Sequence, residues 1–168
     1  MKAMLLPAIA PIEENPLQLV DLPMPRPGSG ELRVRVLTCG VCRTDLHVIE
    51  GDLPRHTLPI GPGHQVVGLD DELGPGCEGF AIGDRVGIAW LRQTCGTCHW
   101  CVSGSENLCP ASAYTGYHAD GGYAEYAVVP GAFAYVIPER FDDLQAAPLL
   151  CAGIIGYRAL QRSGVPPG

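Results

Sequence analysis

Hydrophobic and polar residues alternate most clearly in the segment Glu31–Thr38. Its aliphatic side chains occupy every second position and two arginines lie between them, a period that is typical of a β-strand with one buried face. Other short apolar runs bounded by glycine or proline predict further strands. We expect strands at Lys2–Leu6, Leu17–Leu22, Glu31–Thr38, Gln65–Leu69, Val86–Trp90, Gly121–Val129 and Phe133–Ile137.

The helical signals are shorter and fewer. An acidic residue can cap a helix near position 143, and Pro148 is expected to interrupt that helix. We expect helices at Arg43–Ile49, from Asp142 or Asp143 through Ala147, and at Ile154–Gln161. The chain also contains 22 glycines and 16 prolines, which favour a turn-rich, mainly β architecture over a helical bundle.

The segment Gly74–Gly79 matches the dinucleotide-binding pattern G-x-G-x-x-G letter for letter. In a functional site of this kind the glycines lead into a helix whose N-terminus faces the pyrophosphate. Residues 80–86 instead predict a turn and a strand. We therefore interpret these glycines as a hairpin loop, and no credible dinucleotide fingerprint is found elsewhere in the chain.

Length, composition and charge limit the class of protein. The 168 residues are enough for one domain with a substantial core, and a hydrophobic fraction of 46% argues against disorder. Eleven Lys and Arg against eighteen Asp and Glu give a net charge of −7. This balance argues against nucleic acid and anionic membranes as partners.

The first residues, Met1–Pro11, superficially imitate a secretory signal peptide. The apolar segment is short, contains Pro7 and is followed by Pro11 at the would-be cleavage junction, so we interpret it as a first strand. No apolar run approaches the roughly 20 residues of a membrane-spanning helix. We therefore expect a cytoplasmic protein, where clustered cysteines bind metal more often than they form disulfides.

Four of the eight cysteines lie close together, at Cys95, Cys98, Cys101 and Cys109. Such short spacing lets one loop fold around a single ion and supply all four tetrahedral ligands, which predicts a structural zinc with no open position. His99 lies inside the loop and could replace one thiolate. Four buried or disulfide-bonded cysteines are the other interpretation, and the lobe alone does not specify an enzyme.

A second group of candidates surrounds the stretch Gly40–His47, which contains a thiol at Cys42, a hydroxyl at Thr44 and an imidazole at His47. A thiolate suits zinc, but one cysteine cannot hold a metal alone. The best further ligands are His64 and Cys151. Two cysteines and one histidine would leave a fourth position open, the pattern of a catalytic zinc.

The residues alone leave other interpretations of this group open. His64 could equally be an ordinary buried histidine and Cys151 a core thiol. Cys39 forms a C-x-x-C pair with Cys42, which could be a redox pair or an alternative ligand set. Because Cys39 ends an apolar strand, we favour a core position for it.

Several motifs together resemble the zinc-dependent alcohol dehydrogenases of the medium-chain dehydrogenase/reductase family. They are G-V-C-R-T-D-L-H at residues 40–47, G-H at 63–64, the cysteine lobe at 95–109 and L-C-A-G at 150–153, and they follow the order of the family along the chain. The resemblance implies a GroES-like β-barrel catalytic domain at residues 1–150 with a structural-zinc lobe. Residues 151–168 would form a helical connector to a Rossmann nucleotide-binding domain that this chain lacks.

The resemblance also implies an activity. Members of the family interconvert an alcohol and an aldehyde or ketone by hydride transfer with a nicotinamide cofactor. It implies two zinc ions per chain, one bound by Cys42, His64 and Cys151 and one by the lobe. NAD or NADP would serve a complete enzyme, small alcohols or aldehydes would be the substrates, and a homo-oligomer is expected.

Individual roles follow from the same resemblance. Thr44 is similar to the hydroxyl that hydrogen-bonds the alcohol at the metal, and His47 to the outer end of the proton relay. Asp45 is similar to the carboxylate that orients the histidine ligand, and Arg43 to the residue that meets the cofactor's pyrophosphate. Trp90 is similar to a tryptophan that lines the substrate pocket in the yeast-type members, and a core aromatic is the alternative.

Two features depart from the family. Gln65 follows His64 where the family usually has Glu, which removes one negative charge near the metal and one possible transient ligand. The chain also stops where the family continues into its nucleotide-binding domain. An isolated zinc-binding domain without catalysis, whether a remnant, a split product or a truncated one, is therefore the alternative function.

Overall fold

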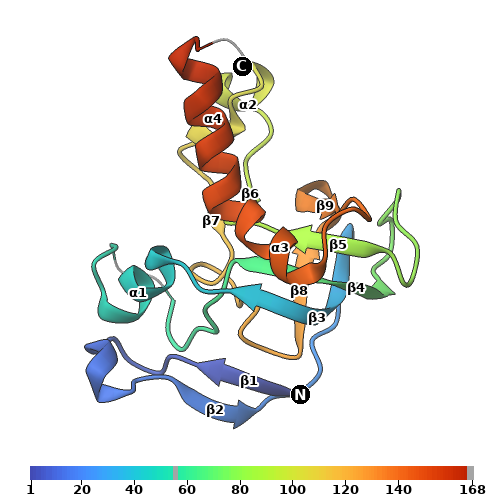
Figure 1. Cartoon of the computed structure of the whole chain (residues 1–168). Coiled ribbons are helices and arrows are strands. Elements are labelled where there is room, and N and C mark those ends of the chain that lie inside the picture. The colour runs from blue at the N-terminus through green and yellow to red at the C-terminus, as the bar shows by residue number, and fades with distance from the viewer. Residues whose placement is uncertain (55–56, 166–168) are drawn as a thin grey trace.

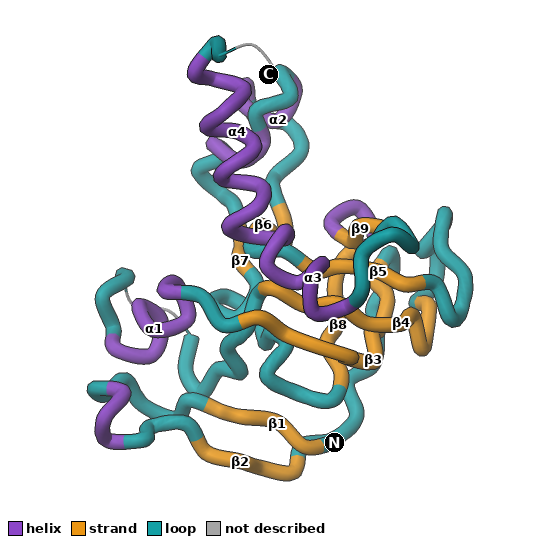
Figure 2. Tube along the Cα trace, viewed as in Figure 1, coloured by secondary structure: helices purple, strands orange, loops and turns teal. Residues whose placement is uncertain are grey.

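The computed structural model describes residues 1–54 and 57–165 (Figure 1). Its centre is a curled, antiparallel five-stranded sheet in the spatial order β8-β3-β4-β5-β9. Loops make up much of the chain between these strands, although a single 3₁₀ turn joins β8 to β9 (Figure 2). The strands are β3 (Glu31–Gly40), β4 (Gln65–Leu73), β5 (Arg85–Ile88), β8 (Tyr126–Pro130) and β9 (Ala134–Val136).

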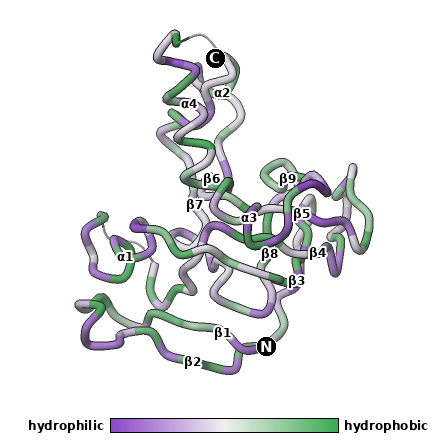
Figure 3. The backbone as a smooth tube through the Cα atoms, viewed as in Figure 1, coloured by the Kyte–Doolittle hydropathy of each residue, from purple (hydrophilic) through white to green (hydrophobic). Residues whose placement is uncertain are grey.

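The strand β3 lies inside the sheet, with β4 on one side and β8 on the other. The side chains of Leu32 and Val34 are fully buried, as the alternation predicts. They pack with Val66, Val86 and Val129 from the neighbouring strands into the main core. Hydrophobic stretches recur along β1 and β3 (Figure 3). Burial of this one face fixes the register of the sheet, since a shift by one residue would expose it.

Smaller elements surround the sheet. β1 (Lys2–Leu5) and β2 (Gln18–Asp21) form an antiparallel pair, and β6 (Leu91–Gln93) pairs with β7 (Ala113–Tyr114) at the base of the cysteine lobe. The lobe contains one short helix, α2 (His99–Val102). Single 3₁₀ turns lie at Ile12–Glu14, Glu106–Leu108 and Gly131–Phe133.

Of the remaining helices, one lies between two strands of the sheet along the chain and two follow the last strand. α1 (Arg43–Glu50) directly follows β3. α3 (Asp143–Pro148) begins after Asp142, whose carboxylate accepts the backbone N–H of Gln145 at 2.7 Å. A π-helical turn at Leu149–Gly153 joins α3 to α4 (Ile154–Ser163), which rises away from the sheet (Figure 1). The final residues of the expected connector, 166–168, lie outside the described part of the chain.

The mainly β fold class with short helices is confirmed, and three local predictions need correction. Pro148 does not interrupt the helix, because it lies in the last turn of α3 and the backbone continues as the π-helical turn. Residues 121–125 are not part of β8. Backbone N–H groups of Gly121, Gly122 and Tyr123 bond to carbonyls of the 61–63 loop instead. The strand expected at Val86–Trp90 ends at Ile88.

Residues 74–79 form part of the loop between the antiparallel strands β4 and β5, and a turn and a strand follow them, as predicted. Among the described residues, none of the helices combines the length and apolar character needed to cross a membrane.

Candidate metal centre

Cys42 immediately precedes helix α1, which begins at Arg43. Asp45, three residues on, turns its carboxylate back, and its Oδ2 atom accepts the backbone N–H of Cys42 at 2.8 Å. This hydrogen bond satisfies a backbone N–H that would otherwise have no partner at the N-terminus of the helix. The start of α1 therefore holds the Cys42 thiol in place and buries Asp45, which is 2% exposed.

His64 lies in the loop before β4 and is 1% exposed. Gly63 makes this possible, because its φ is +100° and an added Cβ would lie 2.8 Å from the backbone nitrogen of Tyr123. The Nδ1 atom of His64 lies 2.9 Å from Oδ1 of Asp45. When Nδ1 donates its proton to that carboxylate, Nε2 presents a free lone pair.

The third residue, Cys151, is part of the π-helical turn between α3 and α4. Its Sγ atom lies 3.7 Å from Sγ of Cys42. Each of the three residues offers one ligand atom, and these atoms lie within 4.8 Å of one another. Two sulfurs about 2.3 Å from a tetrahedral zinc would be separated by about 3.8 Å, so the observed separation of the two thiols fits a shared zinc ion.

The buried Nε2 atom of His64 has no hydrogen-bond partner within the described residues. An orphaned nitrogen beside two thiols is what a metal would satisfy, because buried polar atoms otherwise find partners. The donor set, two sulfurs and one imidazole, suits zinc.

The surroundings shift the pKa values of all three groups. Burial alone would raise the pKa of Cys42, but hydrogen bonds from Thr44 and Cys151 and the nearby His64 lower it below its ordinary value. Burial acts to lower the pKa of His64, and the hydrogen bond and charge of Asp45 outweigh it and raise the pKa. Burial and the Cys42 sulfur raise the pKa of Cys151, which a hydrogen bond from the Gln65 side chain partly opposes.

Thr44 and His47 lie three residues apart on α1, a spacing that places side chains on one face of a helix. Oγ1 of Thr44 lies 3.8 Å from Sγ of Cys42 and lines a pocket beside the metal centre. Nδ1 of His47 lies 2.8 Å from Oδ2 of Asp52, a partner that the sequence did not indicate. Arg43, the first residue of the helix, is exposed.

A pocket of about 450 Å³ opens over the metal centre between the sheet, the lobe and α4. Trp90 lines it, 5.0 Å from the His64 ring in an edge-to-face contact. Tyr114 and Tyr117 stack against Trp90 at 4.9 and 5.8 Å. The hydroxyl of Tyr117 donates to the carbonyl of Pro54 at 2.6 Å, which anchors the stack. Neither tyrosine can be identified from the sequence, because only its distance from Trp90 in space reveals it.

The four lobe cysteines also converge. Sγ atoms of Cys98 and Cys101 lie 3.5 Å apart and those of Cys95 and Cys109 3.6 Å apart, and all four lie within 4.8 Å of one another. These separations exceed an S–S bond, and all eight cysteines of the chain are free thiols. Backbone N–H groups near Cys95 lower the pKa of its thiol to about 6, as suits a thiolate ligand. At Cys98 the backbone of Cys101 acts in the same direction, but desolvation and hydrogen bonds with the other lobe thiols outweigh it and raise the pKa to about 11. His99 is not in this group.

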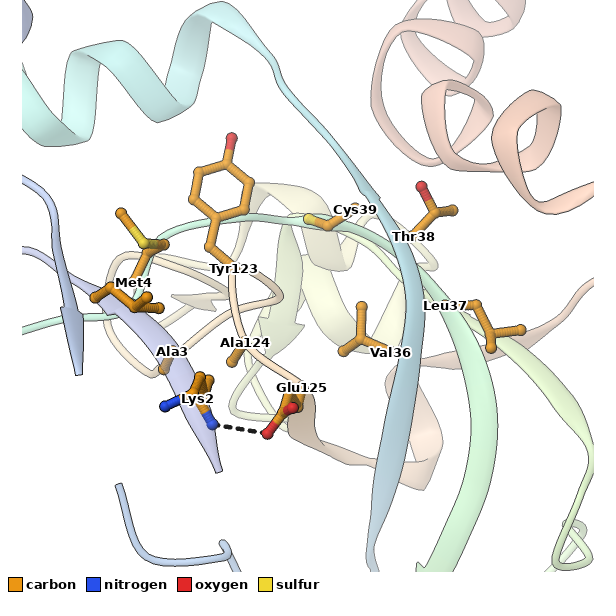
Figure 4. A pocket seen from close by; sticks show the side chains of 11 residues that line it. Lys2, Ala3, Met4, Val36, Leu37, Thr38, Cys39, Tyr123, Ala124 and Glu125 are labelled. Carbon is orange, nitrogen blue, oxygen red and sulfur yellow. Dashed lines mark hydrogen bonds between the residues drawn. The ribbon is translucent and has the colours of Figure 1, made fainter. Parts of the chain in front are cut away.

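Cys39 lies away from both clusters. It lines a shallow groove of about 390 Å³ between β1 and β3, with Tyr123 beside it (Figure 4). Burial raises the pKa of the Cys39 thiol to about 12. A thiol that stays protonated is a poor nucleophile and a poor ligand. This environment favours the core interpretation of Cys39 over a redox pair with Cys42.

An antiparallel, curled sheet that carries a Cys-His-Cys cluster and a separate four-cysteine lobe defines the catalytic domain of a zinc-type medium-chain dehydrogenase. Residues 28–139 match the family described as the alcohol dehydrogenase GroES-like domain, and the chain belongs to that family. The family and the GroES-like fold expected from the sequence are therefore confirmed.

Individual relatives agree with this assignment. The chain is 57% identical over 163 residues to a probable alcohol dehydrogenase AdhA of Mycobacterium tuberculosis, a match that covers 94% of this chain and 47% of that protein. It is 45% identical over 156 residues to an alcohol dehydrogenase of Geobacillus stearothermophilus, with 92% and 46% covered. The chain thus spans about half the length of the curated relatives it matches.

Solved structures show the same similarity. An NAD-dependent alcohol dehydrogenase superposes with a TM-score of 0.91 at 36% identity, which covers all of this chain and 49% of that one. A cobalt- and zinc-bound thermostable alcohol dehydrogenase from Pyrobaculum aerophilum superposes with a TM-score of 0.89 at 34% identity, with 100% and 50% covered.

Proposed function

We propose that this chain is the catalytic half of a zinc-dependent alcohol dehydrogenase that interconverts an alcohol and an aldehyde or ketone with NAD or NADP. The observation that carries the proposal is the convergence of Cys42, His64 and Cys151 beside a pocket. Three protein ligands leave one zinc position for a small molecule. Bound zinc supplies a Lewis acid that acidifies an alcohol and stabilises its negative charge.

The chain's own residues would then bind substrate and move its proton. Trp90, Leu150 and Ile154 give the pocket an apolar wall that suits an uncharged alcohol and limits water. The hydroxyl of Thr44 faces the same pocket and can accept the proton of the alcohol as it gives up its own proton on the other side. His47 lies on the same helix with its Nδ1 bonded to Asp52, so its imidazole is oriented to take the proton outward.

The remaining parts have supporting roles in this proposal. Asp45 orients His64, and exposed Arg43 meets the pyrophosphate of the nicotinamide cofactor with its forked guanidinium. Cys95, Cys98, Cys101 and Cys109 hold a second, structural zinc, so each chain binds two. Residues 1–150 form the catalytic domain and residues 151–168 connect it to a nucleotide-binding domain. The complete enzyme is a cytoplasmic homo-oligomer, and eight reduced thiols fit that compartment.

A second candidate is an isolated zinc-binding domain without catalysis, because the four lobe cysteines can hold a metal with no position left open for a substrate. One experiment separates the two. The chain is fused to the C-terminal half of a relative, loaded with zinc and mixed with a series of primary and secondary alcohols and NAD⁺ or NADP⁺. Alcohol-dependent formation of reduced nicotinamide supports the enzyme, and its absence in a folded, zinc-loaded fusion contradicts it.

A further inference from the structure

Arg92 lies in the short strand β6, at the base of the cysteine lobe. The lobe and its base strands β6 and β7 stand away from the five-stranded sheet (Figure 1). In the pairing of the two base strands, Leu91 faces Tyr114. Gln93 faces Ala113, so Arg92 is an extra residue of β6 with no counterpart in β7. A β-bulge of this kind bends the strand and turns a side chain in a new direction.

The guanidinium of Arg92 reaches two strands of the five-stranded sheet. Its Nη1 donates to the carbonyl of Val128 on β8, and its Nη2 donates to Oε1 of Glu31 on β3 at 3.0 Å. The other carboxylate oxygen of Glu31 accepts the backbone N–H of Gly28 at 2.9 Å, so this acceptor is itself held in place. Within the described part of the chain, the bonds of Arg92 are the only hydrogen bonds between residues 91–114 and the five-stranded sheet.

The ion pair of Arg92 and Glu31 is largely withdrawn from solvent. The side chain of Arg92 is 12% exposed and that of Glu31 is 27% exposed. Burial lowers the pKa of Arg92, the charges of Glu31 and Asp120 oppose this, and the guanidinium stays charged. A buried charge that loses its partners is strongly destabilising. Because a movement of the lobe away from the sheet would break both hydrogen bonds, Arg92 holds the lobe in one orientation.

The lobe contributes one wall of the pocket over the metal centre. Leu91, beside Arg92 in β6, lines this lobe wall together with Glu106 and Asn107. Another part of the same pocket is lined by Ile154 of α4, which does not belong to the lobe. The orientation of the lobe relative to the rest of the chain therefore sets the width of the pocket.

We propose that Arg92 is a positioning residue, which fixes the lobe wall of the pocket and so sets the size of the alcohol that the pocket takes. The selectivity rests on the proposed function, whereas the orientation of the lobe does not. A pocket of about 450 Å³ is many times larger than ethanol, so ethanol held beside Thr44 does not need the lobe wall. A bulky alcohol such as benzyl alcohol fills more of the pocket and gains from contact with that wall.

Two variants change the contacts of Arg92 with the sheet. Arg92→Met keeps an extended side chain and loses every donor, whereas Arg92→Lys keeps the charge but replaces the planar fork with a single ammonium. The ¹⁵N-labelled 168-residue chain is prepared with zinc and weakly aligned, and residual dipolar couplings of its backbone N–H groups are measured. Two rigidly joined parts fit one alignment tensor, so these couplings report orientation rather than stability. The matched control is Arg35→Met, which changes an exposed arginine of β3.

In the parent chain and in Arg35→Met, the couplings of residues 91–114 and of the five-stranded sheet should fit one tensor. In Arg92→Met the lobe couplings should need a separate tensor or become smaller, and Arg92→Lys should lie between the two. A common tensor for Arg92→Met, or separate tensors in the parent chain, would overturn the proposal. If Arg92→Met fails to fold, Arg92→Lys decides, and couplings equal to those of the parent chain would overturn it.

Selectivity is measured in the fusion with the C-terminal half of a relative. The KM for benzyl alcohol should rise by about 10-fold in Arg92→Met, the order of change that a lost apolar contact produces in a pocket. The kcat values and the KM for ethanol should stay within about twofold of the parent, the pattern of a lost ground-state contact. An equal rise for both alcohols would overturn the role in selectivity. A parent fusion inactive with every alcohol would contradict the proposed function and the selectivity with it, while the dipolar couplings still decide whether Arg92 orients the lobe.

Discussion

The carboxylate of Asp45 makes one hydrogen bond toward each of two candidate metal ligands. Its Oδ1 atom lies 2.9 Å from Nδ1 of His64, and its Oδ2 atom accepts the backbone N–H of Cys42 at 2.8 Å. A single buried side chain therefore sets both the ring orientation of the histidine and the position of the thiol. Cys42 and His64 are 22 residues apart in the sequence, and this carboxylate couples them.

Replacing Asp45 tests that coupling. In Asp45→Asn, the amide cannot offer both oxygens, so either the His64 proton or the Cys42 N–H loses its acceptor. We expect metal affinity at the Cys42 centre to fall by about 10-fold to 100-fold. Competition with a chromophoric chelator measures the affinity. Asp21→Asn, on exposed strand β2, is the control. Equal affinity of Asp45→Asn and parent would show that the carboxylate does not position the ligands.

The two separate ligand sets predict a stoichiometry of two zinc ions per chain. Protein purified without chelator and analysed for metal should contain zinc at a ratio near two. A variant that lacks Cys151, such as Cys151→Ser, should retain one zinc, because the lobe is independent of that residue. A reproducible ratio near one in the parent chain would mean that only one of the clusters binds metal.

The lobe and the pocket should differ in their effect on stability. Cys98→Ser removes one of four ligands, and a structural metal site contributes folding free energy directly. We expect a melting temperature lower by on the order of 10 °C, or aggregation. Thr44→Ala removes a pocket hydroxyl and should leave the melting temperature nearly unchanged. Differential scanning calorimetry makes the comparison, and equal melting temperatures would contradict this division of roles.

We expect the buried carboxyl group of Asp70 to make the free energy of unfolding depend on pH. Asp70 lies on β4 facing Val34, is 2% exposed, and neither carboxylate oxygen has a partner among the described residues. Burial, and secondarily the charge of Asp84, raise the pKa of Asp70 to about 7. Because the folded state prefers the protonated form, this group stabilises most below pH 4, and the contribution is lost as the pH rises toward 7.

Asp70→Asn removes that dependence. We expect the variant to be more stable than the parent at pH 8, with a difference that shrinks as the pH falls to 5. The thiol of Cys77, which the charge of Asp70 also affects, keeps its proton in this range, because burial and Asp70 raise its pKa. Urea unfolding at each pH measures the difference. Exposed Glu139→Gln is the control. A pH-independent difference would show that Asp70 does not titrate there.

The proposed proton relay predicts a pH-dependent defect for His47→Gln. In the fusion that carries a nucleotide-binding half, glutamine can hydrogen-bond but cannot accept the proton. Hydride transfer should slow by on the order of 10-fold to 100-fold at neutral and acidic pH and recover at high pH, where hydroxide takes the proton. Pre-steady-state formation of reduced nicotinamide measures this step free of cofactor release. An unchanged pH profile would remove His47 from the relay.

The sequence predicts those parts of the fold that depend on local pattern. The strand β3 follows from its alternation, and the lobe from four cysteines within 15 residues. The strands β6 and β7 have three and two residues, so no periodicity can reveal them. The π-helical turn was not predicted either. Pro148 lacks an N–H, and the sequence alone does not say whether tertiary packing lets the helix continue past it.

The candidate site likewise combines residues that the sequence predicts with contacts that only the fold reveals. Family resemblance points to Cys42, His64 and Cys151, and the structure brings them together. Contacts between distant segments were not predictable from one sequence. Asp52 beside His47 and the tyrosines stacked on Trp90 are of this kind. Gln65 stood out only as a departure from the family, and its burial directly after His64 required the fold.

The placement of Cys151 in the turn between α3 and α4 has a consequence for the order in which the protein matures. The four lobe cysteines are all synthesised by residue 109, so a nascent chain can capture its first ion while the helices that follow are still inside the ribosome. Cys151, by contrast, is synthesised 109 residues after Cys42, with which it forms the other cluster. On the proposed zinc assignment, the pocket-side site would therefore be the last to close, and ion capture there would report that translation has passed the sheet and that α3 has docked onto it.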